Sequence, residues 1–128
     1  MKSYRELQIW QKAREITKNT YAVTRLFPAP EQYALASQMN RSAVSIVSNI
    51  AEGWARSSTK DFLKFLYITR GSIAELETQF ILANDLKYIN DETLSTMEQQ
   101  LTELNKMLAS LITKLKERIH TKSLIASL

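Results

Sequence analysis

The scarcity of chain-breaking residues is the feature that most constrains this fold. Only two of the 128 residues are glycine and two are proline. A β-rich fold needs such residues at many of its turns, so this chain is too poor in them for a fold of that class. The length fits one compact domain, and no linker divides it. The sequence therefore predicts a single all-α domain.

Apolar residues recur at helical spacing in four segments, residues 4–27, 31–53, 59–86 and 91–119. Steps of three and four residues place these side chains on one face of each helix. Connections of a few residues require each helix to run back beside its predecessor, which predicts an antiparallel up-down-up-down four-helix bundle. Residues 121–128 are expected to form a frayed tail. The predicted core positions are Ile9, Ala13, Ile16, Thr20, Val23, Phe27, Leu35, Met39, Ala43, Ile46, Ile50, Phe62, Phe65, Leu66, Thr69, Ile73, Leu76, Phe80, Ala83, Leu94, Met97, Leu101, Leu104, Leu108, Leu111 and Leu115.

Capping residues and prolines mark the predicted helix boundaries. Ser3 begins a Ser-x-x-Glu capping box at the start of the first helix. Pro28 ends that helix, and Pro30 suits the first turn of the second. Ser58 and Asn90 precede the third and fourth helices, where their side chains can accept a hydrogen bond from a free amide.

The two glycines call for separate explanations. Gly53 stands at the end of the second segment, where a left-handed cap favours glycine. Gly71 lies inside the third segment, where a glycine costs roughly 1 kcal/mol relative to alanine. We expect another helix to approach closely there. Asn49 and Glu52 add polar groups beside the apolar face of the second helix.

More large apolar side chains are present than four stripes account for. Two interpretations stay open: a generous core with scattered exposed aromatic residues, or a second apolar face that packs against copies of the same chain. The side chains concerned are Trp10, Tyr21, Tyr33, Val47, Trp54, Leu63, Tyr67, Ile81, Met107, Ile112 and Ile119.

The charge is unevenly distributed along the chain. In an up-down-up-down bundle, residues 1–12, 47–65 and 108–128 share one end, which we call the basic end. It carries ten basic and four acidic residues, a net charge of +6, which leaves −2 of the total of +4 for the rest. Such a field attracts phosphate backbones. The alternative is an ordinary solvated surface, with basic residues late in the last helix favoured by its dipole.

Six stretches carry a family resemblance, in order over residues 4–115. They are Leu7–Ala13, Phe27–Pro28, Gln38–Asn49, Ile50–Gly53, Phe62–Leu66 and Arg70–Gln79. Together they resemble the small bacterial four-helix bundle proteins encoded within intervening sequences of 23S ribosomal RNA genes. The same family includes the accessory variability determinant of diversity-generating retroelements, a basic barrel of five protomers that binds nucleic acid and a reverse transcriptase.

The resemblance implies roles for particular residues. Its signature positions, expected to hold helix contacts within or between protomers, are Asn49, Glu52, Gly53, Arg70, Gly71, Glu75 and Glu77. Its candidates for phosphate contact are Arg41, Arg56, Lys60, Lys64 and Arg70. It also implies a homo-oligomer, by analogy a pentamer. Val47 replaces a common proline, which should leave the second helix straighter. Lys87 replaces a common glycine, so the turn there must close without the easiest left-handed residue.

Three classes of function are compared. We expect a non-enzymatic homo-oligomer that binds RNA or DNA without reading base sequence. The alternative is an adaptor that recruits a partner protein, such as a polymerase, through an apolar side surface. An enzyme is disfavoured, because His120 is the only histidine and, with Glu117, gives one isolated match to the Glu-x-x-His pairs of di-iron bundles. No catalytic residue, metal site or cofactor is expected.

The sequence also predicts a cytoplasmic protein. The first residues contain no apolar signal region, and cysteine is absent. No apolar run approaches the roughly 20 residues that a membrane span requires. A membrane role is therefore not expected.

Overall fold

Four α-helices make up most of the chain. The structure is a computed structural model that describes residues 2–128. The helices are α1 (Gln8–Thr24), α2 (Leu35–Trp54), α3 (Thr59–Asp85) and α4 (Asp91–Ser127), with short 3-10 helices η1 (Tyr4–Glu6) and η2 (Ala29–Tyr33). No strand occurs in the described part of the chain. The predicted all-α fold class is confirmed.

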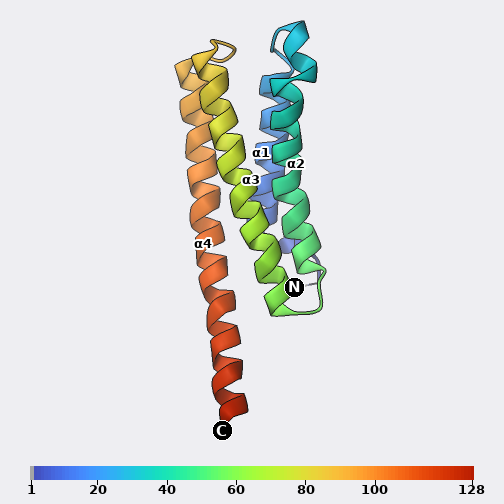
Figure 1. Cartoon of the computed structure of the whole chain (residues 1–128), viewed down its shortest axis with the longest axis vertical. Helices are drawn as coiled ribbons and strands as arrows, with labels where there is room; N and C mark the ends of the chain where they lie inside the picture. The colour runs from blue at the N-terminus through green and yellow to red at the C-terminus, as the bar shows by residue number, and fades with distance from the viewer. Residues whose placement is uncertain (1) are drawn as a thin grey trace.

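The helices lie side by side around one core. Figure 1 shows the chain running along α1, back along α2, and then along α3 and back along α4. α2 contacts α1 and α3, and α4 contacts α3 and α1, so the four helices enclose a shared interior. The start of α1, the connection between α2 and α3, and the last part of α4 lie toward the same end of the molecule (Figure 1).

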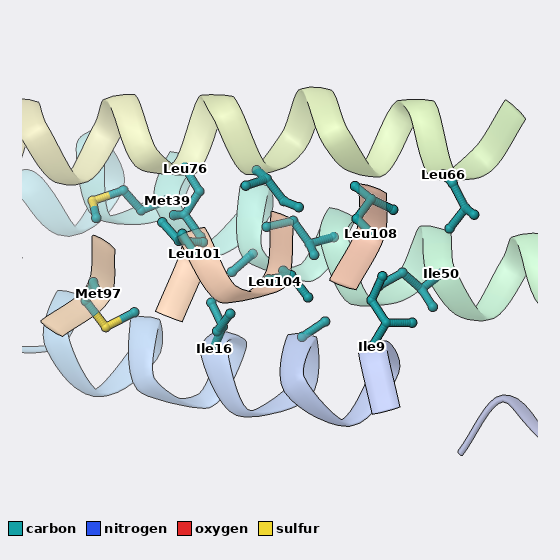
Figure 2. Packing of buried hydrophobic residues seen from close by; sticks show 14 of the residues in the cluster. Ile9, Ile16, Met39, Ile50, Leu66, Leu76, Met97, Leu101, Leu104 and Leu108 are labelled. Carbon is teal, nitrogen blue, oxygen red and sulfur yellow. The ribbon is translucent and has the colours of Figure 1, made fainter. Parts of the chain in front are cut away.

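The interior is built from the predicted apolar stripes. All four helices contribute side chains to it, and Figure 2 shows Ile16, Leu76, Leu101 and Leu104 pointing into the space between the helices. These four side chains are at most 1% exposed. Complete burial of such a side chain stabilises the fold by about 1.5–3 kcal/mol. Val23, Leu35, Leu94 and Leu111 are only partly buried, at the edge of the core, and Phe65, also predicted as a core position, is partly exposed.

The surplus of apolar side chains is smaller than the sequence suggests. Ile112 is 5% exposed and belongs to the core. Six others pack against the core while remaining partly exposed: Trp10, Val47, Trp54, Leu63, Tyr67 and Met107. Tyr21, Tyr33 and Ile81 are exposed, and Ile119 is partly exposed on α4 outside the core. This protomer therefore uses most of these residues within its own fold, which favours the generous core over a broad second apolar face.

Two predicted helix starts are confirmed and one is wrong. The Ser58 Oγ accepts a hydrogen bond from the Asp61 amide at 3.1 Å, and the Asn90 Oδ1 accepts one from the Thr93 amide at 2.8 Å. The Ser3 Oγ instead accepts from the Arg5 amide and caps only η1. The predicted box fails because Leu7 adopts an extended conformation and is buried, which interrupts the helix before Gln8.

The second helix begins later than predicted. Pro30 lies in η2, and Ala34 leaves helical geometry with φ −120° and ψ −107° before α2 begins at Leu35. The Glu31 carboxylate then accepts a hydrogen bond from the Leu35 amide at 3.3 Å. The proline therefore starts a short 3-10 turn rather than α2 itself.

The last helix is longer than predicted, and residues 121–128, where fraying is expected, are all exposed. α4 continues to Ser127 because no proline or glycine follows His120. With 37 residues, α4 is about 55 Å long, whereas the 27 residues of α3 span about 40 Å. Its last turns extend beyond the other three helices (Figure 1).

The structure contradicts the roles predicted for both glycines. Gly53 is a buried helical residue without positive φ, so it is not a left-handed cap. A Cβ atom at Gly53 would lie 2.7 Å from the Cβ of Phe65, because α2 and α3 approach closely there. Gly71 is exposed on α3, and a Cβ there would meet no atom within 4 Å. The close approach predicted for Gly71 is therefore absent within this protomer.

The turn after α3 closes on Lys87. This residue has φ 63°, the left-handed region that favours glycine. The Lys87 amide donates to the Asn84 carbonyl, and the Tyr88 amide donates to the Ala83 carbonyl, both at 2.9 Å. This pair of bonds is the Schellman arrangement, and it holds a lysine where a glycine would be unstrained.

Replacing Lys87 with glycine is expected to stabilise the fold. The left-handed conformation costs a non-glycine residue about 1–2 kcal/mol, part of which is offset by the greater entropy of glycine in the unfolded chain. We expect a net gain of about 0.5–1 kcal/mol in the free energy of unfolding, measured by urea denaturation. Lys87→Ala should give no such gain, because alanine keeps the Cβ atom. Equal stability of the two variants would contradict this account.

Candidate nucleic-acid interface

Two signature positions, Gly53 and Glu75, contact the neighbouring helix across α2 and α3, and a third, Asn49, binds Ser45 within α2. The Asn49 side-chain amide donates to the Ser45 carbonyl at 2.7 Å, and the Ser45 and Ser72 hydroxyls are 2.9 Å apart across the two helices. The Ser42 hydroxyl donates to the Glu75 carboxylate at 2.8 Å. Together with the close approach at Gly53, these contacts make the α2–α3 seam a tight polar joint within the protomer.

The other signature positions lie outside this seam. The Glu52 carboxylate pairs with Arg56 one turn later at 3.4 Å. Glu77 is half-buried, and Arg70 and Gly71 are exposed on α3. The signature set therefore combines residues that hold α2 against α3 with residues that remain accessible on the surface.

The five candidate phosphate contacts do not form one group. Arg56, Lys60 and Lys64 lie around the connection between α2 and α3, and all three are exposed. Arg70 follows Lys64 along α3. Arg41 is exposed near the other end of α2, about 22 Å from Arg56 along the helix axis at 1.5 Å per residue. Arg56, Lys60, Lys64 and Arg70 can therefore act together. Arg41 belongs to a separate part of the surface.

Two cations from different helices meet at Tyr67. The Arg70 guanidinium carbon lies 4.8 Å from the centroid of the Tyr67 ring, and the Lys116 Nζ of α4 lies 5.6 Å from the same centroid. Lys60, Lys64 and Tyr67 share one side of α3 because they are spaced by four and three residues. We call Lys60, Lys64, Tyr67, Arg70 and Lys116 the Tyr67 cluster.

Cation–π contact helps to order Arg70 and Lys116 over the Tyr67 ring. An exposed cation gains about 0.5–1 kcal/mol over an aromatic face. Arg56 is held in the same way, with its guanidinium carbon 4.8 Å from the centroid of the Phe65 ring. The surface therefore presents cations whose side chains are already partly ordered, and this lowers the entropy lost when they bind an anion.

Few of the cations at the basic end are neutralised. Within residues 2–128, the ion pairs are Lys12–Glu103 at 3.0 Å and Arg56–Glu52 at 3.4 Å. Lys12 is thereby removed from the set available to phosphate, since its side chain is only 18% exposed. Among residues 2–128, the four cations of the Tyr67 cluster have no carboxylate partner within 4.0 Å. A bound anion would relieve their mutual repulsion.

The cluster combines a predicted and an unpredicted part. Lys60, Lys64 and Arg70 were candidates from the sequence. Lys116 was counted only in the charge of the basic end, and Tyr67 only as a surplus apolar residue. Their meeting depends on the register between α3 and α4, which no motif in the sequence reports. The basic and aromatic residues between Lys60 and Arg70 indicate only the α3 part of the cluster.

The structure offers little for metal chemistry. No group of three or more histidine, cysteine, aspartate or glutamate residues suited to a metal ion occurs in the part of the chain that the structure describes. His120 and Glu117 are both exposed on α4.

No helix within residues 2–128 combines the length and the apolar character that crossing a bilayer requires.

Comparison with known proteins gives a family match. The family model described as 23S rRNA-intervening sequence protein matches residues 5–110. A crystal structure of a protein of unknown function from the S23 ribosomal protein family of Bacteroides thetaiotaomicron is similar, with a TM-score of 0.77 and 26% sequence identity. The similarity covers 82% of this chain and 95% of that one. No curated protein matches.

Proposed function

We propose that this chain, which belongs to the 23S rRNA-intervening sequence protein family, is a non-enzymatic cytoplasmic protein that binds the phosphate backbone of RNA or DNA. The Tyr67 cluster is the main contact in this proposal, with Arg56 beside it. One observation carries the proposal: Arg70 and Lys116 approach the same ring from two helices, and neither has a carboxylate partner.

The chemistry of the cluster favours binding to phosphates without base reading. Lysine and arginine side chains on an exposed helical surface reach phosphate oxygens readily, and such contacts position a nucleic acid without specifying its sequence. The known readers of base sequence insert a helix or strand into a groove or splay single bases onto a sheet. The Tyr67 cluster instead lies on two adjacent antiparallel helices, α3 and α4, and presents positive charge.

Self-association is part of the proposal. The family resemblance suggests a homo-oligomer, by analogy a pentamer, and several copies of the cluster would raise the overall affinity through avidity. Arg41 would then add phosphate contacts on a separate part of each protomer. Light scattering coupled to chromatography tests this part, and a strict monomer contradicts it.

Salt dependence of RNA binding tests the proposed function. A fluorescently labelled RNA hairpin is titrated with the protein in about 50 mM and in about 200 mM salt, and binding is followed by fluorescence anisotropy. We expect binding at low salt that weakens steeply at high salt, because each phosphate contact releases a counterion. Absence of binding at low salt would refute the proposal.

A protein-binding adaptor is the second candidate. Ile81, Leu82 and Leu86 are exposed near the end of α3, away from the Tyr67 cluster, with exposed fractions of 40%, 45% and 55%. A patch of this kind can recruit a partner such as a polymerase. This reading is favoured if the purified protein retains one specific partner after nuclease treatment and loses it in Leu82→Glu. It is rejected if nuclease releases the partner.

A further inference from the structure

A second set of basic and aromatic side chains surrounds a pocket at the start of α1. The pocket is lined by Tyr4, Arg5, Trp10, Gln11 and Arg14, and has a volume of about 480 Å³. None of these residues belongs to the Tyr67 cluster. The pocket is partly open to solvent.

The pocket is held together by contacts between η1 and α1. The Tyr4 and Trp10 rings meet edge to face, with centroids 5.1 Å apart and an interplanar angle of 81°. The Gln11 side-chain amide donates to the Arg5 carbonyl at 2.8 Å. These contacts cross the extended residue Leu7, which is itself buried in the core. The extended break before α1 therefore folds η1 back beside α1 and forms the pocket.

The chemistry of the lining fits a nucleotide. No acidic residue lines the pocket, and neither arginine takes part in an ion pair within the described residues. The Arg14 guanidinium carbon lies over the Trp10 ring, 5.6 Å from its centroid, so a base that stacks on this face takes the place of the guanidinium. Guanidinium groups bind phosphate oxygens in a bidentate manner, and aromatic side chains stack on nucleobases.

We infer that this pocket binds one unpaired nucleotide of a single-stranded nucleic acid. Arg5 and Arg14 hold the phosphate, and the rings of Tyr4 and Trp10 contact the base. The inference rests on the proposed function, and it adds that the bound nucleic acid has an unpaired segment. The Tyr67 cluster requires only phosphates, whereas this pocket requires a base that is free to stack.

Tryptophan fluorescence gives a direct test, since the chain has only two tryptophans, Trp10 and Trp54. In Trp54→Phe, Trp10 is the sole reporter. Titration with a single-stranded oligoadenylate should quench its emission saturably, and a blunt RNA duplex should not. Arg5→Gln and Arg14→Gln should each weaken this binding about tenfold, as expected for loss of one charged contact. Arg25→Gln, an exposed change at the other end of the same helical segment, is the matched control and should bind as well as the parent.

The possible results separate this inference from the proposed function. Anisotropy that shows RNA binding while Trp10 emission does not change would overturn the pocket and leave the proposed function standing. If adenosine monophosphate quenches Trp10 emission with the same affinity as the oligoadenylate, the pocket binds a free nucleotide, and its assignment to a nucleotide within a single strand is wrong. Loss of all RNA binding at low salt would refute both. Circular dichroism of the arginine variants verifies that they remain folded.

Discussion

Replacing Lys64, Arg70 and Lys116 together with glutamine should weaken RNA binding on the order of 10- to 100-fold at low salt. The slope of log affinity against log salt should fall by about 2, because up to three phosphate contacts are lost at about 0.7–0.9 each. Anisotropy titrations at several salt concentrations measure both quantities. The three side chains are exposed, so the fold should tolerate the changes.

A matched control separates the cluster from the net charge. Arg25, Lys87 and Lys106 are also exposed and form no ion pair in the described part of the chain. Replacing these three with glutamine lowers the net charge by the same amount but leaves the Tyr67 cluster intact. We expect this control to retain most of the affinity and most of the salt slope. Equal losses in the two variants would mean that net charge alone, and not the cluster, drives binding.

Gly53→Ala should destabilise the fold by about 1–3 kcal/mol. A Cβ atom at Gly53 would lie 2.7 Å from the Phe65 Cβ and 2.9 Å from the Phe62 Cδ1. The Cβ of Phe65 is fixed to the α3 backbone, so it cannot rotate away. The two helices must therefore separate, which disturbs the seam held by Ser45 and Ser72. This strain exceeds the roughly 1 kcal/mol that alanine gains over glycine in a helix.

Gly71→Ala is the matched control and should change stability in the opposite direction. The same substitution there meets no atom within 4 Å, so only the helix propensity of alanine remains. We expect an increase of about 1 kcal/mol in the free energy of unfolding, measured by urea denaturation alongside Gly53→Ala. If both variants lost stability, the close approach would not be confined to Gly53 and the packing described for α2 and α3 would be wrong.

Most of the fold could be predicted from the sequence. The stripes of α1 to α4 are long and regular, and their spacing alone gives the helices and the core. The errors lie at the ends of elements, where tertiary contacts decide. Leu7 is drawn into the core and interrupts the first helix, and Gly53 serves packing against Phe65 rather than a turn. Neither effect is visible without the neighbouring helix.

The candidate site was less accessible to sequence reasoning. Lys60, Lys64 and Arg70 follow from composition and family resemblance, and their exposure agrees with the helical phase of α3. The contribution of Lys116 required the register of α4 against α3, which sets its distance to Tyr67. The pocket at Trp10 required the turn at Leu7, since a continuous first helix would not fold η1 back onto α1.

Lysine acetylation footprinting tests the central claim most directly. The protein is acetylated with and without a bound RNA hairpin at low salt, and modification is quantified at each lysine by mass spectrometry. The account predicts that RNA protects Lys60, Lys64 and Lys116, while the exposed Lys87 and Lys106 are modified equally in both samples. Uniform protection of all five lysines, or protection of only Lys87 and Lys106, would contradict binding through the Tyr67 cluster.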